Sequence, residues 1–425
     1  MGKKINFIAL TLLVLLSVLL AENYTELSSS IDSGDTAWML VASALVLLMT
    51  PGLSFFYGGM VNKKSIISTM LQSFIALGVI SVLWIVVGFS LAFGDSIGGF
   101  IGNPLTYFNF SGVGAEPNPE FAATIPFLLF AMFQLKFAII TPALITGSLA
   151  ERVRFRSYIL FMVLFSLFIY SPLAHMTWHP DGLFRQWGIL DFAGGTVVHM
   201  SAGFAALAGA VFLGKRKKNT EVPANVPYVI LGTGLLWFGW FGFNAGSALG
   251  ANSDAVIAFA NTNVASATAM ITWVFYERMV GRKMSAIGAC IGAVVGLVAI
   301  TPAAGFVNIG QSIFIGFIAS LVSNWAIRLR TKSNLDDTLD VFPSHGVGGM
   351  VGMILTAVFA AEVGLVYGST TTFMYHVLGL VLVSIFTFFG SWLLYKFVDL
   401  VIPMRVRHDQ EDRGLDISQH GEQML

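Results

Sequence analysis

Charged side chains are scarce in this sequence. Asp, Glu, Lys and Arg make up 11% of its 425 residues, against 56% for hydrophobic residues. A soluble domain carries about a quarter charged residues, so the composition predicts an integral membrane protein. Lys plus Arg and Asp plus Glu number 23 each, which leaves no overall basic field to attract nucleic acid.

Cysteine is nearly absent as well. The one cysteine, Cys290, lies in an apolar run and is interpreted as a small buried hydrophobe. A single thiol excludes a disulfide framework and a thiolate metal cluster. We therefore expect no metal and no cofactor.

The first 21 residues have the pattern of a signal peptide. Lys3 and Lys4 precede an apolar run, and the small residue Ala21 ends it. Leu19 makes the cleavage site imperfect, so an uncleaved anchor is the alternative. The predicted organisation is a signal peptide at 1–21, a transmembrane domain at 22–404 and a cytoplasmic tail at 405–425.

Long apolar segments fill the rest of the chain, and about eleven of them are long enough to span a membrane as helices. The predicted class is therefore an all-α polytopic membrane protein. The segments are approximately 36–60, 68–93, 121–150, 158–176, 192–213, 228–246, 255–275, 286–301, 309–327, 341–361 and 373–397.

Basic residues follow every second segment, as expected of cytoplasmic loops. In the loops that join the other segment ends, the only basic residue is Arg185. This pattern predicts an amino terminus outside and a carboxyl tail in the cytoplasm. The basic clusters are Lys63-Lys64, Arg152 to Arg156, Lys215 to Lys218, Arg278 to Lys283, Arg328 to Lys332 and Arg405-Arg407.

An internal repeat is visible in two features. The triplet Thr-Pro-Ala at 141–143 recurs at 301–303, and a histidine lies deep in the fifth and the tenth segments, at His199 and His345. Transporters often pair inverted halves and place the site between them. We therefore expect an inverted repeat of five plus five helices with one extra helix.

These two histidines are the main candidates for chemistry. Each lies in a glycine-rich apolar segment, and small residues let helices approach closely. If the segments meet, a hydrogen-bonded imidazole pair could line a narrow path and pass a proton or a small polar solute. Packed structural histidines are the alternative, and a metal site is disfavoured because no further ligand is in register.

Other candidates lie near the start of the fifth segment. Asp191 stands where a helix cap belongs and could also stabilise a cation there. Asp340 stands in the same relation to the tenth segment. Aromatic faces beside a hydroxyl form a plausible cation receptor, although aromatic residues at helical spacing usually only pack. The residues concerned are Phe133, Phe137, Trp178, Phe243 and Ser247.

At these residues the chain resembles the ammonium transporter (Amt/Mep/Rh) family, and Trp178 places it nearer the Amt branch. The resemblance covers almost the whole length after the signal segment. Its motifs are Pro51-Gly52-Leu53 with 55–59, Ile140 to Gly147, Ala150-Glu151-Arg152, Asp191 to His199, Trp240 to Ser247, Asp340-Val341-Phe342 and His345 to Gly349.

The resemblance implies a homotrimer of eleven-helix protomers, each with its own pore, that moves ammonium or ammonia across the cytoplasmic membrane. It also implies a tail that couples protomers and a cytoplasmic face where a PII-type signal protein docks. By motif it assigns ammonium recruitment to Trp178, Phe133 and Ser247 with Asp191 shaping the vestibule, a stacked gate to Phe137 and Phe243, and pore lining to His199 and His345.

This chain departs from the family pattern in two places. His179-Pro180-Asp181 replaces glycines in the loop after Trp178, which alters the charge of the vestibule. Lys136 lies between the two phenylalanines of the third segment, where a buried cation must snorkel, pair or line a wet cavity. We expect its side chain to point away from the pore, because a fixed positive charge beside the gate would repel ammonium.

Three functions are compatible with these residues. The resemblance favours a transporter for nitrogen uptake. An ammonium sensor that signals through its tail is the alternative. An intramembrane enzyme is disfavoured, since no nucleophile or third metal ligand accompanies the histidines.

Overall fold

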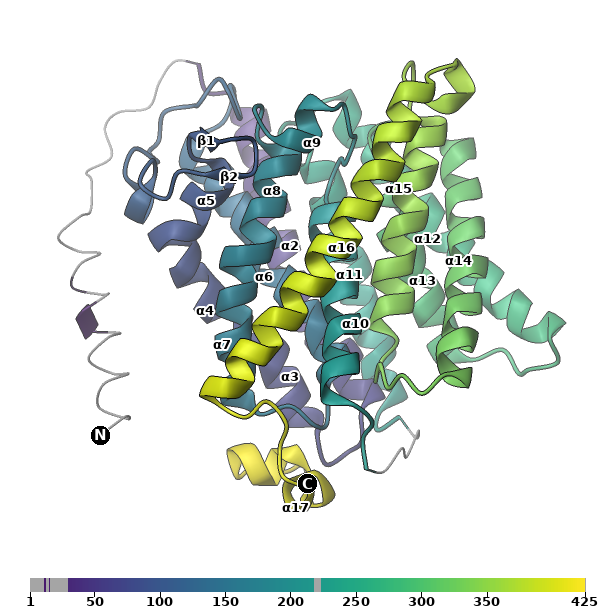
Figure 1. The fold of residues 1–425 in the computed structure, drawn as a ribbon. Helices are drawn as coiled ribbons and strands as arrows, with labels where there is room; N and C mark the ends of the chain where they lie inside the picture. The colour runs from purple at the N-terminus through teal and green to yellow at the C-terminus, as the bar shows by residue number, and fades with distance from the viewer. Residues whose placement is uncertain (1–10, 13–14, 16–29, 218–222, 425) are drawn as a thin grey trace.

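The computed structural model of this chain describes residues 11–12, 15, 30–217 and 223–424 (Figure 1). The predicted signal peptide lies almost wholly outside these residues. The described part is helical apart from its loops and one small sheet, in which β1 (Ser96–Ile97) pairs antiparallel with β2 (Ile101–Gly102).

Ten helical stretches of the described chain are long and apolar enough to cross a membrane, and the shorter apolar helix α13 (Ala286–Ile300) makes an eleventh. They match the eleven predicted segments one to one. In order they are α2 (Ser33–Met60); α3 (Ile66–Phe74), α4 (Ala76–Leu83), η1 (Trp84–Gly88) and α5 (Phe89–Phe93); α6 (Phe127–Leu149); α7 (Phe155–Phe165), η3 (Ser166–Tyr170), α8 (Ser171–Trp178) and α9 (Leu183–Gln186); η4 (Gly195–Met200) and α10 (Ser201–Leu213); α11 (Val226–Gly246); α12 (Ser253–Met279); α13; α14 (Ile309–Lys332); η5 (Phe342–Val347) and α15 (Gly348–Phe359); and α16 (Thr370–Val401).

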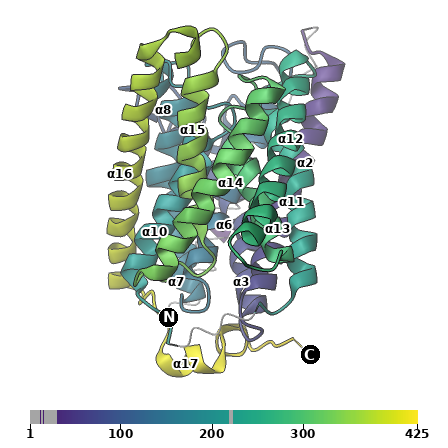
Figure 2. The same cartoon turned by 90° about the vertical axis from the view of Figure 1, so that its right-hand side faces the viewer.

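Short elements lie outside the spanning helices. They are η2 (Phe108–Phe110), η6 (Leu365–Tyr367), α17 (His408–Arg413) and η7 (Asp416–His420). We call the end of the bundle that carries β1 and β2 the hairpin end, and the end that carries α17 the tail end (Figures 1 and 2).

Polar caps begin many of the long helices. The side chain of Asp32 accepts a hydrogen bond from the backbone of Asp35, and Asn308 forms a reciprocal capping box with Gln311. Such caps satisfy amides that a helix start leaves unpaired, which matters most where an apolar surrounding offers no water. The start of such a helix is therefore determined by the polar residue that directly precedes it in the sequence.

The two histidine-bearing segments enter the bundle from opposite ends. η4 with α10 starts at the hairpin end, and η5 with α15 starts at the tail end. Both begin with a π-helical turn, a wide turn that often occurs at functional sites. They cross where a Cβ added at Gly203 would overlap the backbone of Gly346, so only glycine allows this approach.

The tail is docked on the loops of its own chain. The carboxylate of Asp416 accepts hydrogen bonds from the backbone nitrogens of Ile67 and Ser68, at 3.1 and 2.7 Å. Arg405 pairs with Glu411 at 3.1 Å. The segment after α16 is therefore an ordered part of the tail end.

Candidate functional site

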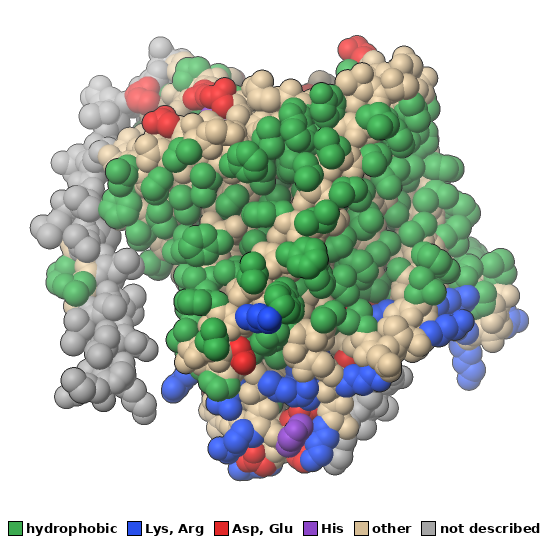
Figure 3. All heavy atoms as spheres, viewed as in Figure 1, with side chains coloured by type: hydrophobic (Ala, Val, Ile, Leu, Met, Phe, Trp, Pro, Cys, Tyr) green, Lys and Arg blue, Asp and Glu red, His purple; other side chains and the backbone are tan. Residues whose placement is uncertain are grey.

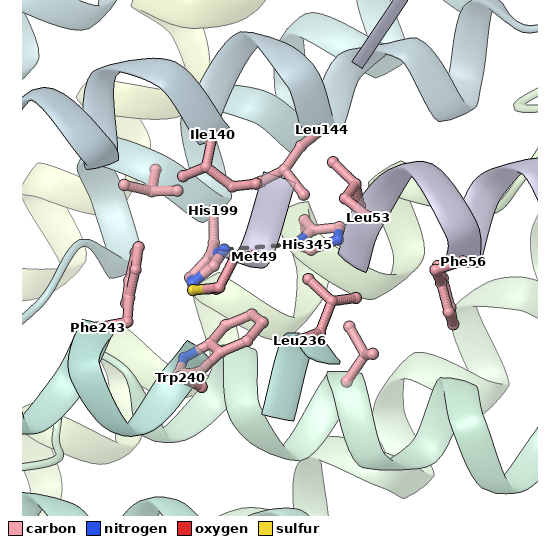
Figure 4. Close-up of a pocket in the computed structure, with 12 residues that line it drawn as sticks. Met49, Leu53, Phe56, Ile140, Leu144, His199, Leu236, Trp240, Phe243 and His345 are labelled. Carbon is pink, nitrogen blue, oxygen red and sulfur yellow. Dashed lines mark hydrogen bonds between the residues drawn. The ribbon is translucent and has the colours of Figure 1, made fainter. Parts of the chain in front are cut away.

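His199 and His345 meet in the middle of the bundle, so the two segments that the sequence analysis left as possible neighbours do come together. Their Nδ1 atoms lie 3.3 Å apart, and the rings are stacked with centroids 5.4 Å apart (Figure 4). Both side chains are buried. A hydrogen bond between two Nδ1 atoms requires one ring to donate and the other to accept, so the two imidazoles hold complementary tautomers.

A narrow cavity surrounds the pair. Its volume is about 10 Å³, close to the minimum for one water-sized molecule. Trp240 stacks on His199 at 5.3 Å and donates its indole N–H to Thr301 Oγ1. Apolar side chains complete the wall, including Met49, Leu53, Phe56, Ile140, Leu144, Leu236 and Val294. Among the described residues, His199 Nε2 has no hydrogen-bond partner and is buried.

Phe137 and Phe243 close this cavity toward the hairpin end. Their rings stack at 4.1 Å with an interplanar angle of 25°. Phe243 also contacts the His199 ring at 6.0 Å between centroids. Stacked rings this close leave no room for a solute, so the side chains must rotate to let one pass.

A second cavity lies beyond the two phenylalanines, at the hairpin end. Its volume is about 270 Å³. It brings together Trp178, Asp191, Ser247 and Phe137, which come from four different membrane-spanning stretches and their ends. The sequence motifs thus converge on one vestibule that ends at the Phe137–Phe243 stack.

The polar atoms of this vestibule are arranged to accept hydrogen bonds. Ser247 Oγ donates to the carbonyl of Phe243 at 2.9 Å, which leaves its lone pairs free. Trp178 Nε1 donates to the backbone oxygen of Asp191 at 3.1 Å, which fixes the indole ring. Gln134 also lines the cavity, and its buried Oε1 has no partner among the described residues.

Gln134 was missed by sequence reasoning, because a glutamine between apolar residues gives no motif. The signal that could have found it is its position three residues before Phe137 on α6, because residues at that spacing share a helix face. Glu120 and Arg185 also line the vestibule, and their side chains carry opposite charges.

Asp191 caps the start of the fifth spanning stretch. The helix begins at Gly195, three residues later than the predicted cap position implies. The carboxylate accepts hydrogen bonds from the backbone nitrogens of Gly194, Gly195 and Thr196 at 2.8, 2.6 and 2.7 Å. Thr196 Oγ1 donates as well. All four donors converge on one buried carboxylate, so the side chain is fixed.

The expectation for Asp340 is wrong. Asp340 pairs with Arg330 at 2.7 Å, whereas Asp337 caps the tenth stretch through the backbone nitrogens of Val341 and Phe342. Asp337 stands eight residues before His345, as Asp191 stands eight residues before His199. The repeat therefore extends to the capping carboxylates, and the equivalent position is Asp337.

Ion pairs fix the loops around Asp337. Arg216 contacts both Glu151 and Asp336 at 2.9 Å. Burial alone would raise the pKa of Asp336, but the hydrogen bonds and charge of Arg216 and the charge of Arg152 hold it below its usual value. Asp336 is therefore ionised, and its neighbour Asp337 is held in place at the tail end.

Three other candidates take different places. Phe133 is buried and does not line the vestibule, but its ring contacts that of Phe137 with centroids 5.0 Å apart. Lys136 is half-buried and lines neither cavity, in agreement with a side chain directed away from the pore. His179 stacks on His175 at 4.4 Å beside the vestibule.

Within the described residues, no three His, Cys, Asp or Glu side chains are grouped to hold a metal ion.

Comparison with known proteins decides the family. The model of the Ammonium Transporter Family matches residues 37–425. The chain belongs to the ammonium transporter family. It is 47% identical to the ammonium transporter of Aquifex aeolicus, over 96% of this chain and 97% of that protein. It is 44% identical to the ammonium transporter of Bacillus subtilis, over 92% and 98%.

Solved structures of the family share this fold. Mep2 from Candida albicans superimposes with a TM-score of 0.85 at 33% identity, covering 91% of this chain and 89% of that one. A protein described as a sensor Amt protein superimposes with a TM-score of 0.84 at 30% identity, covering 91% and 98%. This chain is thus a multi-pass membrane protein of a family of transporters, which are not enzymes.

Proposed function

We propose that this protein imports ammonium across the cytoplasmic membrane, with the hairpin end outside and the tail end in the cytoplasm. The distribution of charge supports this orientation. Lys and Arg side chains gather around the tail end, Asp and Glu appear at the hairpin end, and hydrophobic side chains cover the surface between them (Figure 3). Basic residues are retained on the cytoplasmic side of a membrane.

Recruitment of the cation takes place in the vestibule. Ammonium and potassium have similar sizes, but only ammonium has N–H groups to donate. Ser247 Oγ and Gln134 Oε1 offer acceptors, and the face of Trp178 attracts a cation. Asp191 holds the vestibule in shape through its four hydrogen bonds, and Phe133 supports Phe137 from behind.

Deprotonation follows at the Phe137–Phe243 gate. Passing this stack removes water from the cation, and loss of hydration disfavours the charged form. The solute that continues is ammonia, which fits the narrow cavity around His199 and His345. Neutral imidazoles give ammonia hydrogen bonds that a wholly apolar tube would not. The proton released at the gate crosses by a separate route, which starts near Asp191 and is relayed by the histidine pair, so that transport carries net charge.

The observation that carries this proposal is the order in which three sites follow each other from the hairpin end into the bundle. A polar vestibule, an aromatic stack and a buried imidazole pair follow each other, with Phe137 lining the first site and Phe243 contacting His199 in the last. A wide polar pore would conduct hydrated ions instead. This order fits recruitment of a cation and conduction of its neutral form.

Assembly and regulation complete the proposal. The protein forms a homotrimer with one pore in each protomer, as its family resemblance implies. The ordered tail offers a PII-type signal protein a docking site at the cytoplasmic face. The chain is organised as a transmembrane domain at 22–404 and a tail at 405–425, preceded by the signal peptide.

An ammonium sensor is the second candidate, because one matching structure is described as a sensor Amt protein. A sensor of this fold would bind ammonium in the vestibule and change the docking of the tail. It would not need to move the substrate. The two functions therefore differ in the current that they produce.

The test is the current from proteoliposomes on a supported membrane after an ammonium concentration jump. Protein-free liposomes and a potassium jump are the controls. We expect a current specific to ammonium that falls strongly in His199→Ala, with the same assembled protein by size-exclusion chromatography. Binding of ammonium without any current or ammonia flux would favour the sensor. Unchanged transport in His199→Ala would remove the histidine pair from the mechanism.

A further inference from the structure

The chain approaches Asp191 through an irregular stretch that follows the short helix α9. We call residues 187–191 the approach segment. Its first three amides donate to carbonyl oxygens of the short helix α9: Trp187 to Leu183, Gly188 to Arg185 and Ile189 to Phe184. The amide of Leu190, next to Asp191, has a different partner, the side chain of His376 at 2.9 Å.

His376 comes from α16, the last spanning helix. It is buried, and its Nδ1 lies 3.1 Å from the carbonyl oxygen of Met353 on α15. A carbonyl can only accept and a backbone amide can only donate, so Nδ1 carries the proton and Nε2 accepts from Leu190. Both ring nitrogens are thus used, and one neutral tautomer is required.

Two more contacts join α16 to the approach segment. Tyr375 stacks on Trp187 with centroids 5.6 Å apart. A Cβ added at Gly379 would meet Ile189 Cδ1 at 2.6 Å, so Gly379 gives this side chain its space. Three residues of one helix face therefore hold three of the five residues of the approach segment.

The approach segment also determines where the vestibule groups lie. The backbone oxygen of Asp191 accepts from Trp178 Nε1, and the amide of Phe192 donates to the carbonyl of Pro302. A shift of Leu190 would move this oxygen and, with it, the indole face. His376 touches neither the vestibule nor the pore cavity.

We propose that His376 is a positioning residue for the cation site: it links the approach segment to the helix that carries His345 and so sets the placement of Trp178 and Asp191. This gives the helix outside the five-plus-five repeat a role in substrate affinity. The proposal rests on the proposed function for its transport readout, while its structural readout is independent of transport.

The experiment compares three variants. His376→Leu removes both hydrogen bonds, and His376→Gln keeps an acceptor for Leu190 and a donor for Met353. Thr387→Val is the matched control, because Thr387 is a buried polar residue of the same helix whose hydroxyl has no partner within the described chain. Each is measured by ammonium-jump current over a range of concentrations, and by hydrogen exchange of peptides that cover the approach segment.

We expect His376→Leu to raise the half-saturating ammonium concentration about five- to tenfold, the factor that corresponds to one ordinary hydrogen bond. The maximal current should stay within about twofold, since the gate and the histidine pair are untouched. Exchange at Leu190 should become faster. His376→Gln should restore the half-saturating concentration and the exchange rate at Leu190, and Thr387→Val should change neither of them.

Equal kinetics in His376→Leu and Thr387→Val, or a loss confined to the maximal current, would overturn the proposal. If His376→Leu does not assemble, Gly379→Val must raise the half-saturating concentration by displacing Ile189, and an unchanged value would overturn it. Absence of any current in the unaltered protein would contradict the proposed function instead. The exchange rate at Leu190 would then still decide the role of His376.

Discussion

Replacing Asp191 with alanine should destabilise the start of the fifth spanning stretch and reduce ammonium transport. The substitution leaves four donors without their acceptor: three backbone amides and the hydroxyl of Thr196. At about 1 kcal/mol net for each hydrogen bond, the loss is about 4 kcal/mol. This exceeds the cost of about 0.5–2 kcal/mol for removing an ordinary helix cap.

A graded series separates the cap from the charge. Thr196→Val removes one donor and should cost about 1 kcal/mol while leaving the carboxylate in place. Asp191→Asn keeps a carbonyl oxygen as acceptor and removes the negative charge. We expect thermal stability in detergent to fall in the order unaltered protein, Thr196→Val, Asp191→Asn, Asp191→Ala.

Ammonium-jump currents complete the assay. If the carboxylate acts through the fixed geometry of the vestibule, transport should fall in the same order as stability. A stable Asp191→Asn protein without transport would show that the charge itself is needed. The reasoning would be refuted if Asp191→Ala melted at the same temperature as the unaltered protein, because its four hydrogen bonds would then contribute nothing.

Two further predictions concern the pore and the tail. Gly203→Ala should reduce transport and cost about 1–3 kcal/mol, because the added methyl overlaps the backbone of Gly346 beside His345; a normal current and melting temperature would contradict this. Burial lowers the pKa of His420, so the docked tail binds a proton more weakly than the free tail. Docking should therefore be complete above about pH 6.5 and should weaken as the pH falls below that value. Proteolysis of the tail at a series of pH values measures this, and His420→Gln should remove that dependence. Burial raises the pKa of Asp416, so protonation of that carboxyl acts on docking in the opposite direction.

The spanning helices could be predicted because their signal is local. A run of about 20 apolar residues is read directly from composition, and the alternation of basic loops adds the orientation that we propose. The sequence indicated that His199 and His345 would pair if their two segments met, because the repeat places both at similar depth. The geometry of the histidine pair depends on the contact between Gly203 and Gly346 and on two π-helical turns. No residue pattern indicates those turns.

The capping residue of the tenth stretch could not be predicted reliably. Asp336, Asp337 and Asp340 all precede the helix, and cap preference does not distinguish them at this distance. The choice depends on Arg216, which binds Asp336 from 120 residues away in the sequence, and on Arg330 of α14, which binds Asp340. Gln134 and His376 were missed for the same reason, since their partners or cavities come from other helices.

The crossing of the two histidine helices also limits how transport can be regulated. At Gly203 and Gly346 the main chains themselves are in contact, and no flexible side chain lies between them to absorb a displacement. Control of flux should therefore act by rotating the phenylalanine rings or by obstructing the mouth at the tail end, and the cavity lined by the imidazoles should keep a constant width. On this view the pore is rigid and only its gates move. The protein does not need the large rocking motion by which many carriers expose their sites alternately.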